Sequence, residues 1–354
     1  MTLAPVIHIL PLATVVRERN LPVPGQVVVH LDQKVSPTDV VAETKFSQQH
    51  DLVDVARQLD MASDEADVLI RCREGDAVSD GQVIARGSGL IPRLVKVPRA
   101  GKVLKIANGS VLIEINSPLF KVLAGLPGTI TRVVSDLGVV ITAYGSLIQG
   151  VWGNNRVDMG LLLPSPQMNS SGDILEAKHL DMSLRGAILL AGYINDVRSL
   201  QAAVDLPLRG LILGSLSSDL LSLALQAPFP IVLTEGFGHH PMNPVAYKLI
   251  STNVNRNISL NGSPFNRFNG TRPEVFIPLP VSQPPPQGND SDELSGGKQV
   301  RIRRNPNMFE VGILTSLLPG LTQFPSGLRL PAAEVQLESG QKVKIPLANL
   351  EILG

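Results

Sequence analysis

The chain contains little cysteine, few aromatic residues and no net charge. Cys72 is the single cysteine among 354 residues, which excludes an intramolecular disulfide and a thiolate metal cluster. Basic and acidic side chains number 31 each, so no chain-wide attraction to nucleic acid or anionic lipid is expected. Aromatic residues make up 4% of the chain, and Trp152 is the single tryptophan. We expect it to anchor a core edge or an interface.

Long apolar runs and targeting segments are also missing. No stretch of about 18 uninterrupted apolar residues occurs, which argues against a membrane span. The opening APVIHILPLATVV is short, interrupted by prolines and without a basic start, so it does not predict a signal peptide. With one cysteine, the simplest setting is a reducing cytoplasm.

The length and the 44% hydrophobic content predict several domains, each large enough to bury a core. The predicted fold is α+β and multidomain, with β-rich ends around a small parallel α/β domain. The boundaries that we expect are residues 1–118 for a barrel-sandwich-like domain, 119–165 for a β-rich unit, 174–280 for the α/β domain with an Asn-rich loop, 281–297 for a flexible linker and 298–354 for a terminal barrel.

The α/β domain is predicted from three apolar runs, Ala187–Ala191, Gly210–Leu213 and Pro230–Thr234, each followed by a Gly-containing turn and a helix-period segment. This order is typical of βαβ units on a parallel, Rossmann-like sheet. Ligands of such sheets bind beyond the carboxyl ends of the strands. Those ends are predicted to be the turns Gly192–Asn195, Gly214–Asp219 and Glu235–His240. The ligand-binding candidates in this crevice are Gly214, Ser215, Ser217, Ser218, Glu235, His239 and His240.

Two of these turns carry recognisable chemistry. GSLSSD, from Gly214, has serines that cap a helix and leave backbone N–H groups for an anion. Glu235 with His239 and His240 combines a carboxylate and two imidazoles that titrate near neutral pH. Walker, GxGxxG and GxSxG motifs are missing, and the histidines have no metal-ligand spacing. We therefore predict no cofactor and no metal, and leave the catalytic residues unassigned.

The N-terminal part has a weak internal repeat, Pro24–Thr44 and Val68–Gly89. The second copy, with EGDAVSDGQVIA and then VPRAGKV, resembles the barrel-sandwich hybrid fold of biotinyl and lipoyl domains over Val68–Ile115, the first copy supplying the other half. Such carriers present a modified lysine at a hairpin tip. Here the tip, GSGLIPR, has none, so we expect a structural role. Between the copies, Gln49–Met61 is predicted to be an amphipathic helix with Leu52 on its apolar face.

The C-terminal part follows a Pro-, Gly- and Ser-rich linker, Val281–Gly297. Its strand-like runs VRIRR, VGILTSL, AAEVQLE and KVKIPLANLEIL, with a late ESGQ hairpin, resemble a KOW or SH3-like barrel. KOW domains often bind RNA or transcription and translation proteins. The side chains for such a face are Lys298, Arg301, Arg303, Arg304, Lys342 and Lys344. The loop before the linker carries a mildly basic aromatic group whose expected role is structural, namely Arg256, Phe265, Arg267, Phe268 and Arg272.

Three hypotheses for function follow. The first is a non-catalytic cytoplasmic adaptor or assembly component with protein partners, for which a homo-oligomer is compatible. The second is a small-molecule-binding protein or enzyme that uses the α/β crevice. The third is an RNA-, ribosome- or transcription-associated factor that acts through the C-terminal barrel.

Overall fold

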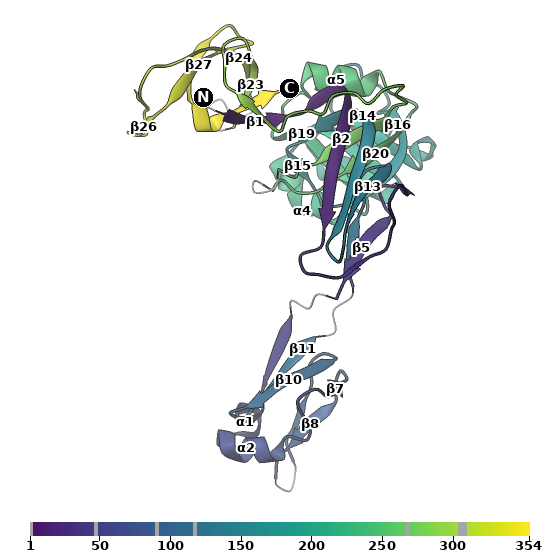
Figure 1. Cartoon of the computed structure of the whole chain (residues 1–354), viewed down its shortest axis with the longest axis vertical. Helices are drawn as coiled ribbons and strands as arrows, with labels where there is room; N and C mark the ends of the chain where they lie inside the picture. The colour runs from purple at the N-terminus through teal and green to yellow at the C-terminus, as the bar shows by residue number, and fades with distance from the viewer. Residues whose placement is uncertain (1–2, 46–48, 89–91, 116–118, 267–269, 304–309) are drawn as a thin grey trace.

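The computed structural model describes residues 3–45, 49–88, 92–115, 119–266, 270–303 and 310–354. Figure 1 shows a central mixed sheet with its helices, the C-terminal strands beside one end of this sheet, and a small β-rich module at the far end of the long axis. The expected strand-rich α+β class is confirmed. None of the helices in these residues has the length and apolar character needed to cross a bilayer.

The central sheet has the order β15-β19-β18-β17-β16-β20-β21-β14. Strand β14 also pairs with β2 and with β13, and β13 pairs with β4. Strands β16 to β19 are parallel neighbours and the others are antiparallel. Their bounds are β2 Ile9–Asn20, β4 Lys34–Val35, β13 Gly128–Val134, β14 Gly138–Gln149, β15 Trp152–Gly153, β16 Val157–Pro164, β17 Ala187–Ile194, β18 Gly210–Leu216, β19 Ile231–Phe237, β20 Asn257–Asn261 and β21 Glu274–Pro278.

Helices cover both faces of the parallel strands because apolar side chains alternate between the faces. Leu189 and Leu211 pack with α3 and α4 on one face, whereas Ile188 and Ile212 pack with α5 on the other. The helices are α3 Val197–Asp205, α4 Leu221–Gln226 and α5 Pro244–Ser251, with short 3-10 turns η1 Ala177–His179, η2 Met182–Leu184 and η3 Ser218–Leu220.

The three predicted runs lie in β17, β18 and β19, but each strand continues beyond its predicted end, to Ile194, Leu216 and Phe237. The expected turns at Gly192 and Gly214 were wrong. A Cβ on Gly192 would lie 2.4 Å from the Asp173 carbonyl oxygen, and one on Gly214 would lie 2.8 Å from the Met242 nitrogen. These glycines allow neighbouring backbone to approach the strands closely.

A second, three-stranded sheet packs near β14 and shares a hydrophobic core with it. It contains β3 Gln26–Val27, β5 Val40–Thr44 and β12 Phe120–Leu123. Its core includes Val15, Val41, Leu126, Ile130 and Ile141. The first repeat copy, residues 24–44, thus belongs to this core and not to the barrel-sandwich-like module, where we expected it.

The small module occupies the chain between β5 and β12. Its elements are β6 His50–Asp54, α1 Val55–Leu59, α2 Ser63–Leu69, β7 Ala77–Val78, β8 Val83–Arg86, β9 Leu94–Lys96, β10 Gly101–Ala107 and β11 Ser110–Ile115. The predicted helix from Gln49 was wrong in its first half. Leu52 pairs with Leu112 in the sheet and is 68% exposed. The side chain of Asp54 accepts a hydrogen bond from the Arg57 N–H and starts the helix at Val55, as an N-cap does.

The C-terminal part of the chain forms a seven-stranded sheet that includes the first strand of the chain, and we keep the name C-terminal barrel for it. Its sheet has the order β22-β1-β29-β23-β24-β27-β28, with a separate β25-β26 hairpin. The bounds are β1 Leu3–Ile7, β22 Ser291–Glu293, β23 Gln299–Ile302, β24 Val311–Leu317, β25 Thr322–Gln323, β26 Arg329–Leu330, β27 Ala332–Leu337, β28 Lys342–Pro346, η4 Leu347–Asn349 and β29 Leu350–Leu353.

The segment 281–297, expected to be a flexible linker, is an ordered arm along β1 and β2. The Thr14 N–H donates to the Pro286 carbonyl, and the Val6 N–H donates to the Asp290 carbonyl. Leu294 is 1% exposed in the barrel core. Prolines permit this edge position because they have no N–H group that needs a partner. The buried side chain of Leu294 fixes the segment to the core, and the polar composition of the segment does not reveal this contact.

Candidate functional site

The crevice residues predicted from the sequence do not converge on one site. Glu235, in β19, is buried; its Oε1 accepts from the Asn243 N–H at 2.9 Å and its Oε2 pairs with the Arg301 Nη2 at 2.8 Å. Ser215 is fully buried and holds His240, donating to its carbonyl and accepting from its N–H. His239 is exposed and stacks on Tyr193. These side chains therefore support the β19–α5 connection.

The serines of the predicted anion loop lie at the start of η3. Ser217 is the N-cap residue but its side chain makes no capping hydrogen bond, and Ser218 is exposed. Gly214 is buried inside β18. The α4 helix that follows has six residues, too short for a strong terminal dipole.

The cations predicted for a nucleic-acid face are largely neutralised or buried. Arg301 is 2% exposed and faces Glu235 rather than solvent. Lys298 pairs with Asp292, Lys342 with Glu334 and Arg303 with Glu351. Lys344 is exposed. Arg304, like Arg267 and Phe268 of the preceding loop, lies outside the described residues.

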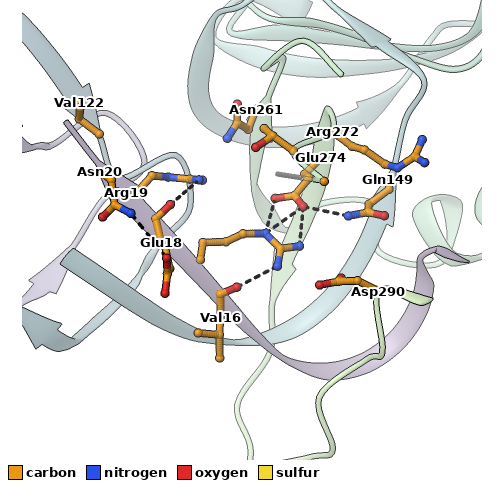
Figure 2. Close-up of a pocket in the computed structure, with 13 residues that line it drawn as sticks. Val16, Glu18, Arg19, Asn20, Val122, Gln149, Asn261, Arg272, Glu274 and Asp290 are labelled. Carbon is orange, nitrogen blue, oxygen red and sulfur yellow. Dashed lines mark hydrogen bonds and ion pairs between the residues drawn. The ribbon is translucent and has the colours of Figure 1, made fainter. Parts of the chain in front are cut away.

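A polar pocket of about 480 Å³ lies elsewhere, where β2 faces the ends of β14, β20 and β21 (Figure 2). Its lining includes three arginines, three carboxylates and three side-chain amides, namely Arg17, Arg19, Arg272, Glu18, Glu274, Asp290, Asn20, Gln149 and Asn261. The volume is within the range of about 300–1,000 Å³ that is typical of small-molecule sites.

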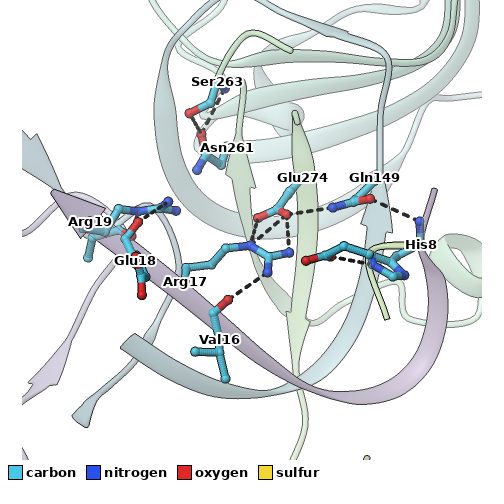
Figure 3. A network of polar contacts seen from close by, with 11 residues as sticks. His8, Val16, Arg17, Glu18, Arg19, Gln149, Asn261, Ser263 and Glu274 are labelled. Carbon is cyan, nitrogen blue, oxygen red and sulfur yellow. Dashed lines mark hydrogen bonds and ion pairs between the residues drawn. The ribbon is translucent and has the colours of Figure 1, made fainter. Parts of the chain in front are cut away.

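Strand register builds the two sides of this pocket. Gln149, Glu274 and Asn261 are direct partners across three adjacent strands, β14, β21 and β20, and directly paired residues share a sheet face. Arg17 and Arg19 occupy alternate positions of β2 and so share a face as well. The row formed by Gln149, Glu274 and Asn261 thus lies opposite the two arginines (Figure 3).

A chain of hydrogen bonds fixes one half of the pocket (Figure 3). The Arg17 guanidinium donates to Glu274 through Nε and Nη2, at 3.0 and 2.5 Å from Oε1, and through Nη1 to the Val16 carbonyl. Gln149 Nε2 donates to the same Glu274 oxygen at 3.2 Å, and Gln149 Oε1 accepts from the His8 N–H. His8 Nε2 lies 3.1 Å from Asp290 Oδ1, which joins the arm to the network.

Opposing effects set the ionisation of Glu274. Burial raises its pKa, but the charge of Arg17, hydrogen bonds from Arg17 and Gln149, and the charge of Arg19 together hold the pKa below its usual range. The pKa of Arg17 is raised, because its attraction to Glu274 outweighs the effect of burial. The pair is therefore ionised, and it is the fixed wall of the pocket.

Arg19 stands in the other half without a matching carboxylate. Its Nε donates to the Ala124 carbonyl at 2.8 Å and its Nη1 to the Glu18 carbonyl at 3.4 Å. No acidic side chain among the described residues lies within 4.0 Å of its guanidinium, whereas Glu274 is paired with Arg17 and Glu18 with Arg132. Burial and the nearby positive charge of Arg17 lower the pKa of Arg19, although the negative charge of Glu274 acts to raise it. The positive charge of Arg19 is therefore only partly balanced by its surroundings.

An amide donor stands beside Arg19. Asn261 is 4% exposed, and its Oδ1 accepts from the Ser263 N–H at 3.0 Å and from the Ser263 hydroxyl at 2.6 Å. These bonds direct Nδ2 away from Ser263. A Cβ on Gly125 would lie 2.7 Å from both Asn261 Nδ2 and Arg19 Nη2. Both donor nitrogens therefore lie close to the backbone of Gly125. The arrangement presents hydrogen-bond donors and positive charge to an anion.

The sequence analysis missed this site because its residues come from segments far apart in the chain. Arg17 and Arg19 offer a weak signal, since alternating arginines in an apolar strand place two charges on one face. Gln149, Asn261 and Glu274 become neighbours only through sheet register. Among the described residues, no group of three His, Cys, Asp or Glu side chains could hold a metal ion.

No protein-family model matches the chain, and no curated protein matches it.

Proposed function

We propose that the protein binds a small anionic ligand, carrying a carboxylate or a phosphate group, in the pocket between β2 and the ends of β20 and β21. The observation that carries this proposal is the Arg19 guanidinium, which lies in the pocket without a carboxylate partner. A ligand anion between Arg19 and Asn261 would supply the missing charge and accept their hydrogen bonds.

Energetics favour this assignment over a purely structural role for Arg19. A cation with incomplete compensation in a partly dry site is costly, and each charge-assisted hydrogen bond that completes it contributes roughly 1.5–3 kcal/mol. Arg17 already has Glu274 as its partner. Arg17 and Glu274 would therefore orient the pocket, while Arg19 and Asn261 would hold the ligand.

The test is a calorimetric titration of the full chain with inorganic phosphate and, separately, with succinate, at low ionic strength. We expect saturable binding of at least one of the two. Arg19→Gln should weaken it at least about 10-fold, the loss expected for one charge-assisted hydrogen bond. Arg209→Gln is the matched control, since Arg209 is exposed, pairs with Asp158 and is not among the residues that line this pocket, so its loss should leave the affinity unchanged.

The two ligands separate the chemical classes. Binding of phosphate alone would identify a phosphate-bearing ligand, and binding of succinate alone a carboxylate-bearing one. The proposal is overturned if neither anion binds saturably, or if Arg19→Gln and Arg209→Gln bind as tightly as each other.

For the domain families, we infer that the parallel strands β16 to β19 with α3, α4 and α5 form a Rossmann-like domain and that residues 298–354 form an SH3-like barrel of the KOW type. The support is the strand order and the predicted strands of the two regions. The adaptor role, the RNA-associated role and the cytoplasmic location stay predictions from the sequence.

A further inference from the structure

A second cavity, of about 240 Å³, lies between the edge of the central sheet and the C-terminal barrel. The sheet side contributes Trp152 of β15 and Phe237 of β19, whose rings meet edge to face with centroids 5.5 Å apart. Phe265 approaches from the loop after β20. Three aromatic side chains thus line a cavity in a chain with only 4% aromatic residues.

Arginines surround the same cavity. Arg272 and Arg303 lie near Phe265, with the guanidinium carbons 4.5 and 5.6 Å from the ring centroid. Arg272 Nη2 donates a hydrogen bond to Glu351 Oε1 at 2.9 Å, and Arg303 Nε forms an ion pair with the same oxygen at 3.2 Å. Arg303 is 39% exposed at its side chain, so it keeps donors for a group that enters from solvent.

Arg301 supplies the observation that points to a ligand. Its side chain is 3% exposed; Nη2 pairs with Glu235 at 2.8 Å and Nη1 donates to the Thr234 carbonyl at 3.2 Å. Its Nε is buried and has no hydrogen-bond partner among the residues that the structure describes. A buried donor without an acceptor costs roughly 1–3 kcal/mol, which an acceptor atom placed in the adjoining cavity would remove.

Charge at the cavity favours an anion. The arginines contribute three positive charges, Arg272, Arg301 and Arg303, and their partners Glu235 and Glu351 contribute two negative ones, so 3 − 2 leaves one positive charge. The volume is just below the range of about 300 Å³ and more that is typical of drug-sized ligands. A single ring with one carboxylate matches this size, this charge and the aromatic lining.

We propose that this cavity is a second binding site, for a single-ring aromatic carboxylate. The ring lies against the lining of Trp152, Phe237 and Phe265, and the carboxylate accepts hydrogen bonds from Arg303 and from the free Nε of Arg301. The site requires the α/β sheet and the C-terminal barrel together, because each provides part of the lining. It is separate from the Arg19 pocket, although Arg272 borders both.

Trp152 provides a direct test, since it is the single tryptophan and lines the cavity. The full chain is titrated with benzoate while tryptophan fluorescence is recorded, and 4-fluorobenzoate is followed in parallel by fluorine NMR. We expect a saturable response in both. Benzamide, which has the same shape without the charge, and cyclohexanecarboxylate, which has the charge without the aromatic ring, should each bind about 10-fold more weakly.

Arg303→Gln should weaken benzoate binding by about 5- to 10-fold, because a partly exposed charged donor is lost. Lys342→Gln is the matched control; Lys342 lies in the same barrel, is 56% exposed and pairs with Glu334, and its change should leave binding unaltered. Saturable benzoate binding that is reduced by Arg303→Gln alone supports the site. Absence of a saturable response in both readouts, equal binding of benzamide, or equal affinity of the two variants overturns it.

Discussion

Arg301 of β23 and Glu235 of β19 form a buried ion pair, with 2.8 Å between Nη2 and Oε2 and side chains 3% and 4% exposed. The sequence pattern predicts a nucleic-acid face for the first residue and a ligand crevice for the second. In the structure they hold the C-terminal barrel against the central sheet. A buried pair of this kind is costly to break from one side, because the remaining charge stays buried.

Arg301→Met is therefore expected to destabilise the chain by about 3 kcal/mol. The double variant Glu235→Gln/Arg301→Met should be less destabilised than the single one, because no buried charge is left unpaired. Urea unfolding followed by Trp152 fluorescence measures both. Lys342→Met, which breaks the exposed pair with Glu334, should cost less than about 1 kcal/mol. Simple additivity of the Glu235 and Arg301 changes would contradict the coupling.

Glu274 predicts a dependence of stability on acid. Its folded-state pKa lies below the usual value, through Arg17 and despite burial, so its stabilising contribution is present above the unfolded pKa of about 4.3 and is lost as pH falls through the lower folded value. Calorimetric Tm values of wild type and Glu274→Gln should differ most near neutral pH and should converge as the pH falls from the unfolded pKa of about 4.3 through the lower folded pKa. A gap that stays constant with pH would argue against an ionised Glu274, and Glu65→Gln, on the exposed face of α2, is the control.

Gly125 tests the geometry of the anion pocket. Its φ is +77°, and a Cβ there would lie 2.7 Å from Arg19 Nη2 and Asn261 Nδ2. Gly125→Ala should cost about 1 kcal/mol from the backbone and also weaken anion binding, because both donors must move. Gly81→Ala shares the positive φ, +73°, but has no heavy atom within 4 Å. It should show the loss of Tm with unchanged affinity; equal affinity losses in the two variants would contradict the role of the two donors.

Leu294 tests whether residues 281–297 act as an arm or as a linker. Leu294→Ala should lower stability by about 2–4 kcal/mol, the range for a truncated core leucine, because the side chain is 1% exposed. Leu321→Ala, in the same barrel but 63% exposed, should change stability by less than about 0.5 kcal/mol. Thermal unfolding with limited proteolysis of the arm measures both. A neutral Leu294→Ala would restore the linker interpretation.

Local patterns predicted the strands well and their partners poorly. The run VGILTSL coincides with β24, Val311–Leu317, because alternation within a strand is a local property. The apolar run Ala187–Ala191 likewise predicted a strand of a parallel sheet, and in the structure Leu189 and Leu190 of this strand pack into the cores on opposite faces of the sheet. Strand ends were harder: Gly214 resembles a turn in sequence, but it gives room for the backbone at Met242, a neighbour that no local pattern reveals.

The candidate sites lay beyond prediction for a related reason. Arg301 alternates with apolar residues just as a solvent-facing cation does, and its burial depends on Glu235, 66 positions earlier in the chain. Arg19 and Asn261 meet because β2 pairs with β14, β14 with β21 and β21 with β20. Local charge and composition do not predict which distant strands pair.

The place of β1 in the C-terminal barrel has a consequence for synthesis. β1 pairs with β22 and β29, so residues 3–7 find their partners only after residues 291–353 have been made. Pairings with so large a sequence separation form slowly, and unpaired strand edges invite association between chains. The β1 edge therefore stays unpaired until the last part of the chain has been made, and its pairing with β22 and β29 joins the two ends of the protein in one sheet (Figure 1).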